Sequence, residues 1–279
     1  MPAYLNDKFL ENDEAMLHVS DLSMQRGYAV FDFFRTINGV PLFIADHLDR
    51  FYASAISLHL IVRKKNGELA TIIHELIKRS SLSEAGIRLM LTGGYSSDNY
   101  HPAEPNLLIT CNPVQTATQP DFEKGYSIIT HEYQRELPNV KSINYLMAVW
   151  LQPLMKEKQV DDILYVRNGI ISEFPRSNVF IITKDNKLVT PAHNILAGVT
   201  RKNVMALAAE KMAVQERDIT TEELMNAAEV FLTSTTKRIL PIVKIDNKII
   251  GNGKPGKITT VLYEAFLELE DSFVQFVSR

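Results

Sequence analysis

Apolar residues in the first half of the chain alternate between strand-like and helix-like spacing. Residues 31–37 and 40–44 are rich in large apolar side chains, and Asn38-Gly39 lies between them. Because Asn-Gly accepts the positive φ angles of a tight turn, this pattern predicts a β-hairpin. Two later stretches have apolar residues every three or four positions, as on one face of a helix. These positions are Leu48, Phe51, Tyr52, Ala55 and Ile56, then Leu69, Ile72, Ile73, Leu76 and Ile77.

Most of the remaining predicted elements lie in the second half. Asn168-Gly169 indicates another hairpin, and Thr220 with Glu223 has the spacing of a capping box before a short helix. Asp46 is expected to cap the first helix. The predicted strands are 88–91, 107–111, 126–130, 162–166, 170–172, 179–183, 230–234 and 242–245. The predicted helices, besides those already given, are 145–156, 201–212 and 258–269, so the fold class is α/β (α+β).

The chain length indicates two domains. At roughly 150 residues per domain, 279 residues correspond to about two. The stretch from Asn112 to Asp121 holds two prolines and few large apolar residues, which is typical of a linker. We therefore expect an N-terminal domain at 1–113, a linker at 114–124 and a C-terminal domain at 125–279.

Composition and charge exclude several classes of protein. With 30 Lys and Arg against 33 Asp and Glu, the net charge is −3, which gives no general attraction to nucleic acid or anionic lipid. The start of the chain lacks the pattern of a signal peptide, and no apolar run approaches the ~18 residues of a membrane span, so we expect a cytoplasmic protein. The single cysteine, Cys111, forms no internal disulfide and no Cys-clustered zinc site, and is expected to be a small buried residue. No metal site is predicted.

Two segments, one in each expected domain, carry cationic residues suited to ligand binding. Arg50 points away from the apolar face of its predicted helix. It is either a solvated surface residue or a guanidinium that makes a two-point contact with phosphate or carboxylate. Lys141 precedes an apolar helix, where it either extends along the surface or, when partly desolvated, reacts with a carbonyl carbon.

Two further segments, in the second half, offer an acid and an anion site. Glu173 follows a hairpin strand and is either a solvated acid or the partner of a protonated heterocyclic nitrogen. Gly198 to Thr200 open a helix whose free N–H groups favour an anion, unless this is a plain connecting loop. Residues 233–236 add hydroxyl groups, although a β-branched strand end has the same pattern. Taken together, a lysine, an acid and an anion cup are what pyridoxal 5′-phosphate requires.

The order of these segments resembles that of the class IV aminotransferases, which are pyridoxal-phosphate enzymes of fold-type IV. The shared pattern is His-x-x-Arg, Lys-x-x-Asn, Ser-Glu-x-x-x-Ser-Asn-x-Phe, Gly-Val-Thr-Arg and Thr-Ser-Thr-Thr, and the similarity spans Tyr4 to Leu269. Relatives include branched-chain aminotransferases, D-amino acid aminotransferases and 4-amino-4-deoxychorismate lyases. The resemblance implies a smaller N-terminal α/β sandwich, a larger C-terminal pseudo-barrel domain, an active site between the two, and a homodimer.

The resemblance also implies roles for individual residues. Lys141 would bond covalently to the cofactor and carry the substrate proton, and Glu173 would bind the pyridine nitrogen. The phosphate would be bound by Arg50, the backbone N–H groups of Val199 and Thr200, and the Thr235 hydroxyl. Tyr145 would lie near the cofactor 3′-oxygen, and Asn178 belongs to the same cofactor-binding set. The implied substrate-binding residues are Phe31, Arg35, Gly93, Thr236 and Lys237, the last two through their backbone.

Several positions depart from the family pattern. Relatives have Gly-Asp-Gly-x-Phe-Glu where this chain has residues 27–32, ending in Phe31-Asp32. D-amino acid aminotransferases use an arginine where this chain has Gly93, so their carboxylate trap is missing. The lyases have a catalytic threonine in the region of Phe33 and Phe34. Bulky residues 174–176 follow Glu173, and Arg176 either binds an acidic substrate or, as we favour, faces solvent.

These observations lead to three kinds of interpretation. The first is transamination between an amino acid, with branched-chain amino acids among the candidates, and a 2-oxo acid, by a ping-pong mechanism. The alternatives within the family are a D-amino acid aminotransferase and a 4-amino-4-deoxychorismate lyase. A third interpretation is a non-catalytic binding module that has kept the cofactor cup, although the presence of both Lys141 and Glu173 argues against it.

Overall fold

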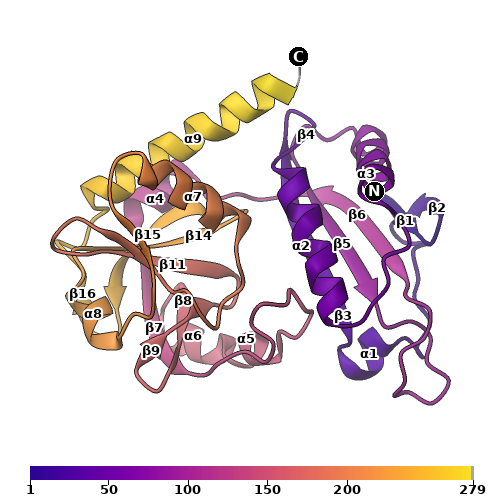
Figure 1. The fold of residues 1–279 in the computed structure, drawn as a ribbon, viewed down its shortest axis with the longest axis horizontal. Coiled ribbons are helices and arrows are strands. Elements are labelled where there is room, and N and C mark those ends of the chain that lie inside the picture. The colour runs from indigo at the N-terminus through magenta and orange to yellow at the C-terminus, as the bar shows by residue number, and fades with distance from the viewer. Residues whose placement is uncertain (278–279) are drawn as a thin grey trace. The chain divides into compact units, whose positions relative to one another are not determined.

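A computed structural model describes residues 1–277, which form two compact units (Figure 1). The first unit comprises residues 1–115, 140–144 and 272–277, and the second comprises 116–139 and 145–271. Two segments of the expected C-terminal domain thus belong to the first unit. The reason is packing, because Val140 is buried in the core of the first unit and the ring of Phe273 lies 4.8 Å from that of Phe43.

The first unit is built on an antiparallel sheet of six strands in the order β2-β1-β6-β5-β3-β4. Helices α2 and α3 pack on this sheet (Figure 1). Their apolar faces bury Leu48, Phe51, Leu69, Ile73 and Leu76 against it. The elements are β1 (Pro2–Leu5), β2 (Lys8–Glu11), α1 (Leu22–Arg26), β3 (Ala29–Ile37), β4 (Val40–Pro41), α2 (Ile44–Ser57), α3 (Asn66–Ser80), β5 (Ala85–Thr92) and β6 (Leu107–Pro113).

The predicted hairpin at Asn38-Gly39 is confirmed, with β3 paired to β4 and positive φ angles at both turn residues. The prediction that Asp46 caps the following helix is wrong. Helix α2 begins at Ile44, after Phe43 in a left-handed conformation with φ 51°, and Asp46 lies in its first turn. There its negative charge still complements the helix dipole.

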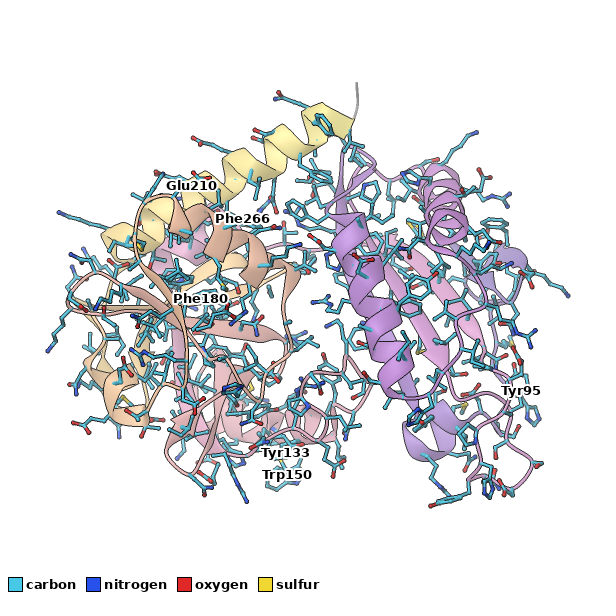
Figure 2. All side chains as sticks on the ribbon, in the orientation of Figure 1. Tyr95, Tyr133, Trp150, Phe180, Glu210 and Phe266 are labelled. Atoms are coloured by element: carbon cyan, nitrogen blue, oxygen red, sulfur yellow. The ribbon has the colours of Figure 1, made fainter. Side chains whose placement is uncertain are left out.

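The second unit contains a mixed sheet of ten strands, whose main order is β13-β12-β11-β14-β15-β7-β8-β9. Strand β10 pairs with β11 and also contacts β8, so the sheet curls back on itself as a partial barrel. Phe180, which is labelled in Figure 2, is fully buried and stacks on Phe231, with ring centroids 5.0 Å apart. The strands are β7 (Tyr126–Glu132), β8 (Asp162–Arg167), β9 (Ile170–Ile171), β10 (Glu173–Phe174), β11 (Ser177–Ile182), β12 (Leu188–Thr190), β13 (Val214–Glu216), β14 (Glu229–Ser234), β15 (Arg238–Ile245) and β16 (Lys248–Ile249).

The helices differ from the sequence expectation in several places. The expected linker contains α4 (Gln119–Lys124), in which Pro120 occupies the first turn, where a missing N–H costs nothing. The single helix expected at 145–156 is divided at Leu151 into α5 (Leu146–Trp150) and α6 (Gln152–Lys158), because Pro153 favours a new helix start. The helix expected at 201–212 begins two residues earlier, at Val199. The remaining helices are α7 (Val199–Ala209), α8 (Thr221–Asn226) and α9 (Lys257–Val277).

Within residues 1–277, no helix is both long enough and apolar enough to cross a bilayer.

Candidate active site

Lys141 is held against the sheet of the first unit by its backbone. Its carbonyl accepts a hydrogen bond from the Phe31 N–H at 2.9 Å, and its own N–H donates to the Ser54 hydroxyl at 3.1 Å. The side-chain Nζ lies 4.6 Å from the centroid of the Phe31 ring. Lys141 is therefore fixed between β3 and α2, with its amine over an aromatic face, and two of the predicted site residues are brought together.

Asp32, His47 and Arg50 form a buried ionic network close to Lys141. Asp32 is fully buried on β3, and its carboxylate accepts hydrogen bonds from Arg50 Nε at 2.8 Å and from the Arg50 terminal nitrogen at 2.9 Å. The same carboxylate lies 2.7 Å from His47 Nδ1. This two-point contact fixes the guanidinium of Arg50 in one orientation. We call Phe31, Asp32, His47, Arg50 and Lys141 the lysine cluster.

The charges in the lysine cluster are set by burial and by mutual contact. Burial alone would raise the pKa of Asp32, but the charges of Arg50 and His47 and their hydrogen bonds hold it well below its usual range. Burial lowers the pKa of His47, and the charges of Arg50 and Lys141 lower it further against the opposing effect of Asp32. A neutral His47 therefore donates its Nδ1–H to an ionised Asp32.

Two other predicted substrate-binding residues lie in the same unit. Arg35 is on β3 and is almost fully buried, so it is not a solvated strand residue. Gly93 follows β5, and a Cβ built there would lie 2.9 Å from the Tyr28 ring and 3.0 Å from the Leu22 Cβ. The arginine that D-amino acid aminotransferases are expected to place at this position would therefore require the Tyr28 and Leu22 side chains to move.

In the second unit, Glu173 is buried at the start of β10 and is held at both carboxylate oxygens. Oε1 accepts a hydrogen bond from Arg135 Nε at 2.7 Å, and Oε2 accepts one from the Leu196 N–H at 2.9 Å. The Arg135 guanidinium also donates to the Pro138 carbonyl. Glu173 is thus a fixed, ion-paired carboxylate and not a solvated strand-end acid.

Strand register places Glu173 in a row with two other polar side chains. Glu173 pairs with Asn178, and Asn178 pairs with Thr233, across β10, β11 and β14. Asn178 donates through Nδ2 to the Leu196 carbonyl at 2.8 Å, whereas the buried Thr233 hydroxyl has no hydrogen-bond partner among the described residues. A buried polar group without a partner is costly, so the Thr233 hydroxyl marks this row as suited to a polar ligand. We call Arg135, Glu173, Asn178, Leu196 and Thr233 the glutamate cluster.

Helix α7 begins beside the glutamate cluster. Gly198 is its N-cap residue and provides no side-chain cap, so the N–H groups of Val199 and Thr200 lie at an uncapped helix start. A Cβ at Gly198 would lie 2.2 Å from Asn178 Oδ1, so only glycine allows this approach. Val199 and Thr200, which are predicted to bind the phosphate, therefore lie near Glu173, which is predicted to bind the pyridine nitrogen. Asn178 and the 196–198 loop connect the two.

We expect Gly198→Ala to destabilise the second unit. The added methyl group would displace the Asn178 amide and break its hydrogen bond to Leu196, at a cost of about 1–3 kcal/mol. A lower midpoint in urea unfolding, with weaker pyridoxal-phosphate binding, is the expected result. Gly169→Ala is an unsuitable control because its φ is 76°, but Gly67→Ala, in the open first turn of α3, should lower neither property. Equal urea midpoints for Gly198→Ala and the parent protein would contradict the role assigned to Gly198.

The other predicted residues of the second unit differ in their burial and in their contacts. Thr235 and Thr236 lie in the turn between β14 and β15, where the Thr236 carbonyl accepts a hydrogen bond from the Ala117 N–H at 2.8 Å. The Lys237 N–H donates to the Ser234 hydroxyl, and its Nζ pairs with the buried Asp162 at 2.7 Å. Tyr145 is half-buried at the N-cap of α5, and Arg176 is exposed, as favoured from the sequence.

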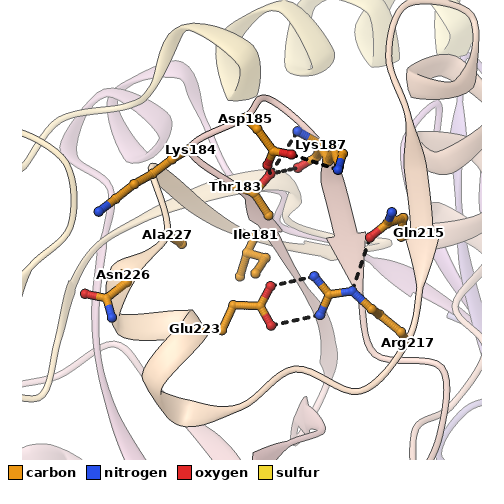
Figure 3. A pocket seen from close by; sticks show the side chains of 10 residues that line it. All are labelled: Ile181, Thr183, Lys184, Asp185, Lys187, Gln215, Arg217, Glu223, Asn226 and Ala227. Carbon is orange, nitrogen blue, oxygen red and sulfur yellow. Dashed lines mark hydrogen bonds and ion pairs between the residues drawn. The ribbon is translucent and has the colours of Figure 1, made fainter.

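The hollow drawn in Figure 3 is a different feature and contains none of the predicted site residues. This cavity of about 550 Å³ lies in the second unit, and its charges are largely satisfied internally. Arg217 makes a two-point ion pair with Glu223, and Lys187 pairs with Asp185 at 2.7 Å. Across the described chain, no group of three His, Cys, Asp or Glu side chains is arranged to hold a metal ion.

Three residues that organise the site are not among those predicted from the sequence: Asp32, His47 and Arg135. Asp32 stands out in the sequence only as a departure from the family glutamate, and His47 only as the first residue of the motif His-x-x-Arg. The sequence does contain a signal for His47. Residues three positions apart on a helix lie side by side, which places His47 next to Arg50. Arg135 has no comparable signal, since its partner Glu173 is 38 residues away.

The chain is similar to known proteins over most of its length. The family model for amino-transferase class IV matches residues 29–245. A D-alanine aminotransferase from Bacillus licheniformis is 30% identical over 266 residues, with 93% of each chain covered. A putative branched-chain-amino-acid aminotransferase from Methanocaldococcus jannaschii is 31% identical over 278 residues, with 96% of each chain covered.

Solved structures show the same fold. The branched-chain amino acid aminotransferase of Escherichia coli superposes with a TM-score of 0.90 at 24% sequence identity, covering 96% of this chain and 94% of that one. The predicted α/β architecture, with its sandwich and its pseudo-barrel, is therefore confirmed. Given the matching family model and the similarity over nearly the full length, this chain belongs to the class IV aminotransferases.

Proposed function

We propose that the protein uses pyridoxal 5′-phosphate to transfer an amino group between an amino acid and a 2-oxo acid. The observation that carries this proposal is Lys141, whose backbone is hydrogen-bonded on both sides and whose amine lies over Phe31. A second branched-chain amino acid aminotransferase with the same fold has been crystallised with pyridoxamine 5′-phosphate.

The described residues fit this cofactor. The fixed carboxylate of Glu173 would keep the pyridine nitrogen protonated, and the buried Thr233 hydroxyl and the uncapped start of α7 offer polar contacts beside it. The phosphate would be bound by anion-binding groups of the usual kinds, a helix start, a hydroxyl and a guanidinium. These are supplied by Val199, Thr200, Thr235 and Arg50. When bound, the cofactor supplies an electron sink for the bonds at the substrate Cα.

The protein side chains would then perform the proton chemistry and the positioning. Lys141 Nζ would take the proton from the substrate Cα and return it during the second half of the exchange. Arg135 holds Glu173, and Asp32 holds Arg50, so the groups that would bind the ring and the phosphate would not need to reorganise. The remaining members of the proposed site are Asn178 and Tyr145 for the cofactor, and Phe31, Arg35, Gly93, Thr236 and Lys237 for the substrate.

Branched-chain amino acids are the first donors to test. A putative branched-chain-amino-acid aminotransferase is 31% identical to this chain. The Tyr28 and Leu22 side chains crowd Gly93, so the arginine expected of D-amino acid aminotransferases would require them to move. The D-alanine aminotransferase from Bacillus licheniformis, at 30% identity, keeps D-alanine on the list of donors.

A homodimer is part of the same proposal. Met16, Val19 and Met24 are 73%, 62% and 61% exposed, which is unusual for large apolar side chains close together in the sequence. A second copy of the chain would cover them. The cytoplasmic location expected from the sequence stays a prediction.

The proposal is tested by following half of the reaction alone. The purified protein, loaded with pyridoxal phosphate, should be yellow, and one equivalent of amino donor should bleach the colour and release one equivalent of keto acid without any acceptor. Adding 2-oxoglutarate or pyruvate should restore the colour, as a ping-pong mechanism requires. A panel of L- and D-amino acids, beginning with leucine, valine and D-alanine, would identify the donor.

Two results would favour other functions. Release of pyruvate and an aromatic amine from 4-amino-4-deoxychorismate, with no need for an acceptor, would indicate the lyase. A colourless protein that does not respond to added pyridoxal phosphate would indicate a non-catalytic binding module.

A further inference from the structure

Residues 235–237 form a short turn between β14 and β15, next to the glutamate cluster. Ser234 and Arg238 are paired across the base of this turn. On β14, Thr233 precedes Ser234 and pairs with Asn178 of the glutamate cluster. Because strand residues are about 3.3 Å apart, the turn begins about 7 Å beyond Thr233. The turn consists of the three residues that the family resemblance assigns to the cofactor phosphate and to the substrate, which are Thr235, Thr236 and Lys237.

Arg238, the first residue after the turn, has a backbone conformation that suits glycine. Its φ is 54°, in the left-handed region, where the Cβ of an L-residue comes too close to the following carbonyl oxygen. Glycine adopts this conformation without that cost and is a common choice in short hairpin turns. Another residue keeps a strained conformation only where surrounding contacts hold it there. We therefore expect the contacts of the Arg238 side chain to hold its backbone in place.

The Arg238 side chain is paired with a buried acid on helix α9. Its Nε donates a hydrogen bond to Glu270 Oε2 at 2.8 Å, and the Glu270 side chain is only 4% exposed. A carboxylate that is removed from water needs a charged or hydrogen-bonding partner. Turning the guanidinium away would take this cation from a buried carboxylate, so the ion pair resists any change in the conformation of Arg238.

The two residues before Arg238 are held as well. The Lys237 Nζ lies 2.7 Å from Asp162 Oδ2, and both side chains are largely buried. The Thr236 carbonyl accepts a hydrogen bond from the Ala117 N–H at 2.8 Å. Three consecutive residues of the turn and its end are thus fixed by three different parts of the chain. Because the cations of Lys237 and Arg238 are both engaged by acids, an anion that binds at the turn would be held by backbone N–H groups.

We propose that Arg238 and Glu270 are positioning residues, whose ion pair holds the backbone of Thr236 and Lys237 ready to bind the α-carboxylate of the amino donor. The inference rests on the proposed function, which assigns the donor to this stretch of backbone. Neither Arg238 nor Glu270 contacts the donor. Their ion pair fixes the φ angle of Arg238, and this angle sets the direction of the peptide groups that precede it. N–H groups held in this way bind an anion without first having to be ordered.

The test uses substitutions that separate the ion pair from the backbone strain. Arg238→Gly removes the guanidinium but accepts the left-handed φ, and Glu270→Gln removes the acid without changing the turn. Arg238→Lys keeps a charge that can still reach Glu270. The matched control is Glu223→Gln, which breaks the two-point ion pair with Arg217 in the same unit, at the cavity of Figure 3.

Two small ligands report on the carboxylate site separately from the rest of the active site. Propanoate is alanine without its amino group, and ethylamine is alanine without its carboxylate. The dissociation constant of each is measured by calorimetric titration of the holoenzyme at saturating pyridoxal phosphate. The urea midpoint of each variant is measured alongside, and kcat and KM are determined for the preferred amino donor.

Arg238→Gly and Glu270→Gln should each raise the dissociation constant of propanoate by about 10-fold, the effect of losing one hydrogen bond to a charged group. The dissociation constant of ethylamine should stay at the parent value. KM for the donor should rise by a similar factor while kcat changes little, as expected when binding is lost equally from the ground state and the transition state. The double variant should resemble Arg238→Gly, because one interaction is lost in both. Arg238→Lys should restore part of the affinity, and Glu223→Gln should change neither ligand.

Three results would overturn the inference. If Arg238→Gly bound propanoate as tightly as the parent protein, the ion pair would serve stability alone, even with a lower urea midpoint. Tighter binding of propanoate by Glu270→Gln would mean that the released guanidinium attracts the carboxylate itself. An equal loss of propanoate and ethylamine affinity would indicate general damage to the site. If Glu270→Gln does not fold, the comparison of Arg238→Gly with Arg238→Lys decides between these results and the expected one.

The failure of the inference is distinguishable from the failure of the proposed function. A parent holoenzyme that transaminates no amino acid would contradict the proposed function, and this inference with it. A parent holoenzyme that transaminates, with variants that bind propanoate as the parent does, would contradict only the role of Arg238 and Glu270.

Discussion

Lys141→Ala is expected to lower the rate of transamination by about 10⁴-fold or more. A positioned acid–base group contributes up to about this factor, and Lys141 would also provide the covalent attachment of the cofactor. Stability should change little, because the contacts that anchor Lys141 to Phe31 and Ser54 are made by its backbone and are kept by alanine. The measurement is the rate of keto-acid release in a single turnover, together with borohydride labelling of the protein by pyridoxal phosphate.

Lys78→Ala is the matched control, since it removes an exposed lysine from α3 in the same unit. It should keep both the parent rate and the borohydride label. Methylamine added to Lys141→Ala should restore part of the proton transfer, because a small amine can occupy the space left by the side chain. If Lys141→Ala were to transaminate at the parent rate, or to retain the label at another lysine, the assignment of Lys141 would be wrong.

Local sequence patterns predict much of the fold. The hairpin at Asn38-Gly39 is predicted correctly because its turn depends on two adjacent residues, and α3 is predicted correctly because its apolar face has the same spacing throughout. The start of α2 is not predictable in the same way. Phe43 takes a positive φ there without a side-chain cap, and no local signal favours an aromatic residue in that conformation.

The composition of the two units cannot be read from local patterns either. Residues 140–144 follow the expected linker in sequence, which places them in the second domain by prediction. They pack with the first unit because the Lys141 carbonyl accepts from the Phe31 N–H and the Ile143 N–H donates to the Ala29 carbonyl. Contacts between residues more than 100 positions apart leave no trace in hydrophobic spacing.

The predicted site residues are identifiable by motif, whereas the residues that hold them in place are not. A motif reports the groups that meet a ligand, and here it points to Arg50 and Glu173. Their ion-pair partners, Asp32 and Arg135, depend on tertiary packing. In an isolated sequence a strand aspartate and a loop arginine are ordinary residues, and only the structure shows that each meets an opposite charge at hydrogen-bonding distance.

Asp32→Asn is expected to destabilise the first unit by about 3–5 kcal/mol, the range for breaking a buried ion pair by removing one partner. The amide cannot accept all three hydrogen bonds that the carboxylate receives from Arg50 and His47, and its own NH₂ group would face other donors. The urea midpoint should therefore fall at pH 7. Pyridoxal-phosphate affinity should fall too, because Arg50 would lose its fixed orientation.

Two further variants serve as comparisons for Asp32→Asn. Asp7→Asn removes an exposed acid paired with Lys64, and should cost no more than about 1 kcal/mol because surface ion pairs contribute little. Asp32→Glu, which restores the acid found in relatives, keeps the charge and should be milder than Asp32→Asn in both stability and cofactor affinity. A urea midpoint for Asp32→Asn equal to that of the parent protein would show that the network does not stabilise the unit.

The effect of Asp32→Asn on stability should depend on pH, and the sign of this dependence follows from the lowered pKa of Asp32. A carboxyl group whose pKa is lower in the folded than in the unfolded protein stabilises the fold fully above its unfolded value, near 3.8, and loses that contribution as the pH falls further. The difference in unfolding free energy between parent and Asp32→Asn should thus be constant from pH 7 to about pH 5 and shrink below about pH 4. Urea unfolding at a series of pH values measures this difference. A gap that widens in acid would mean that Asp32 is protonated in the folded protein, and Arg50 would then need another anion to hold it.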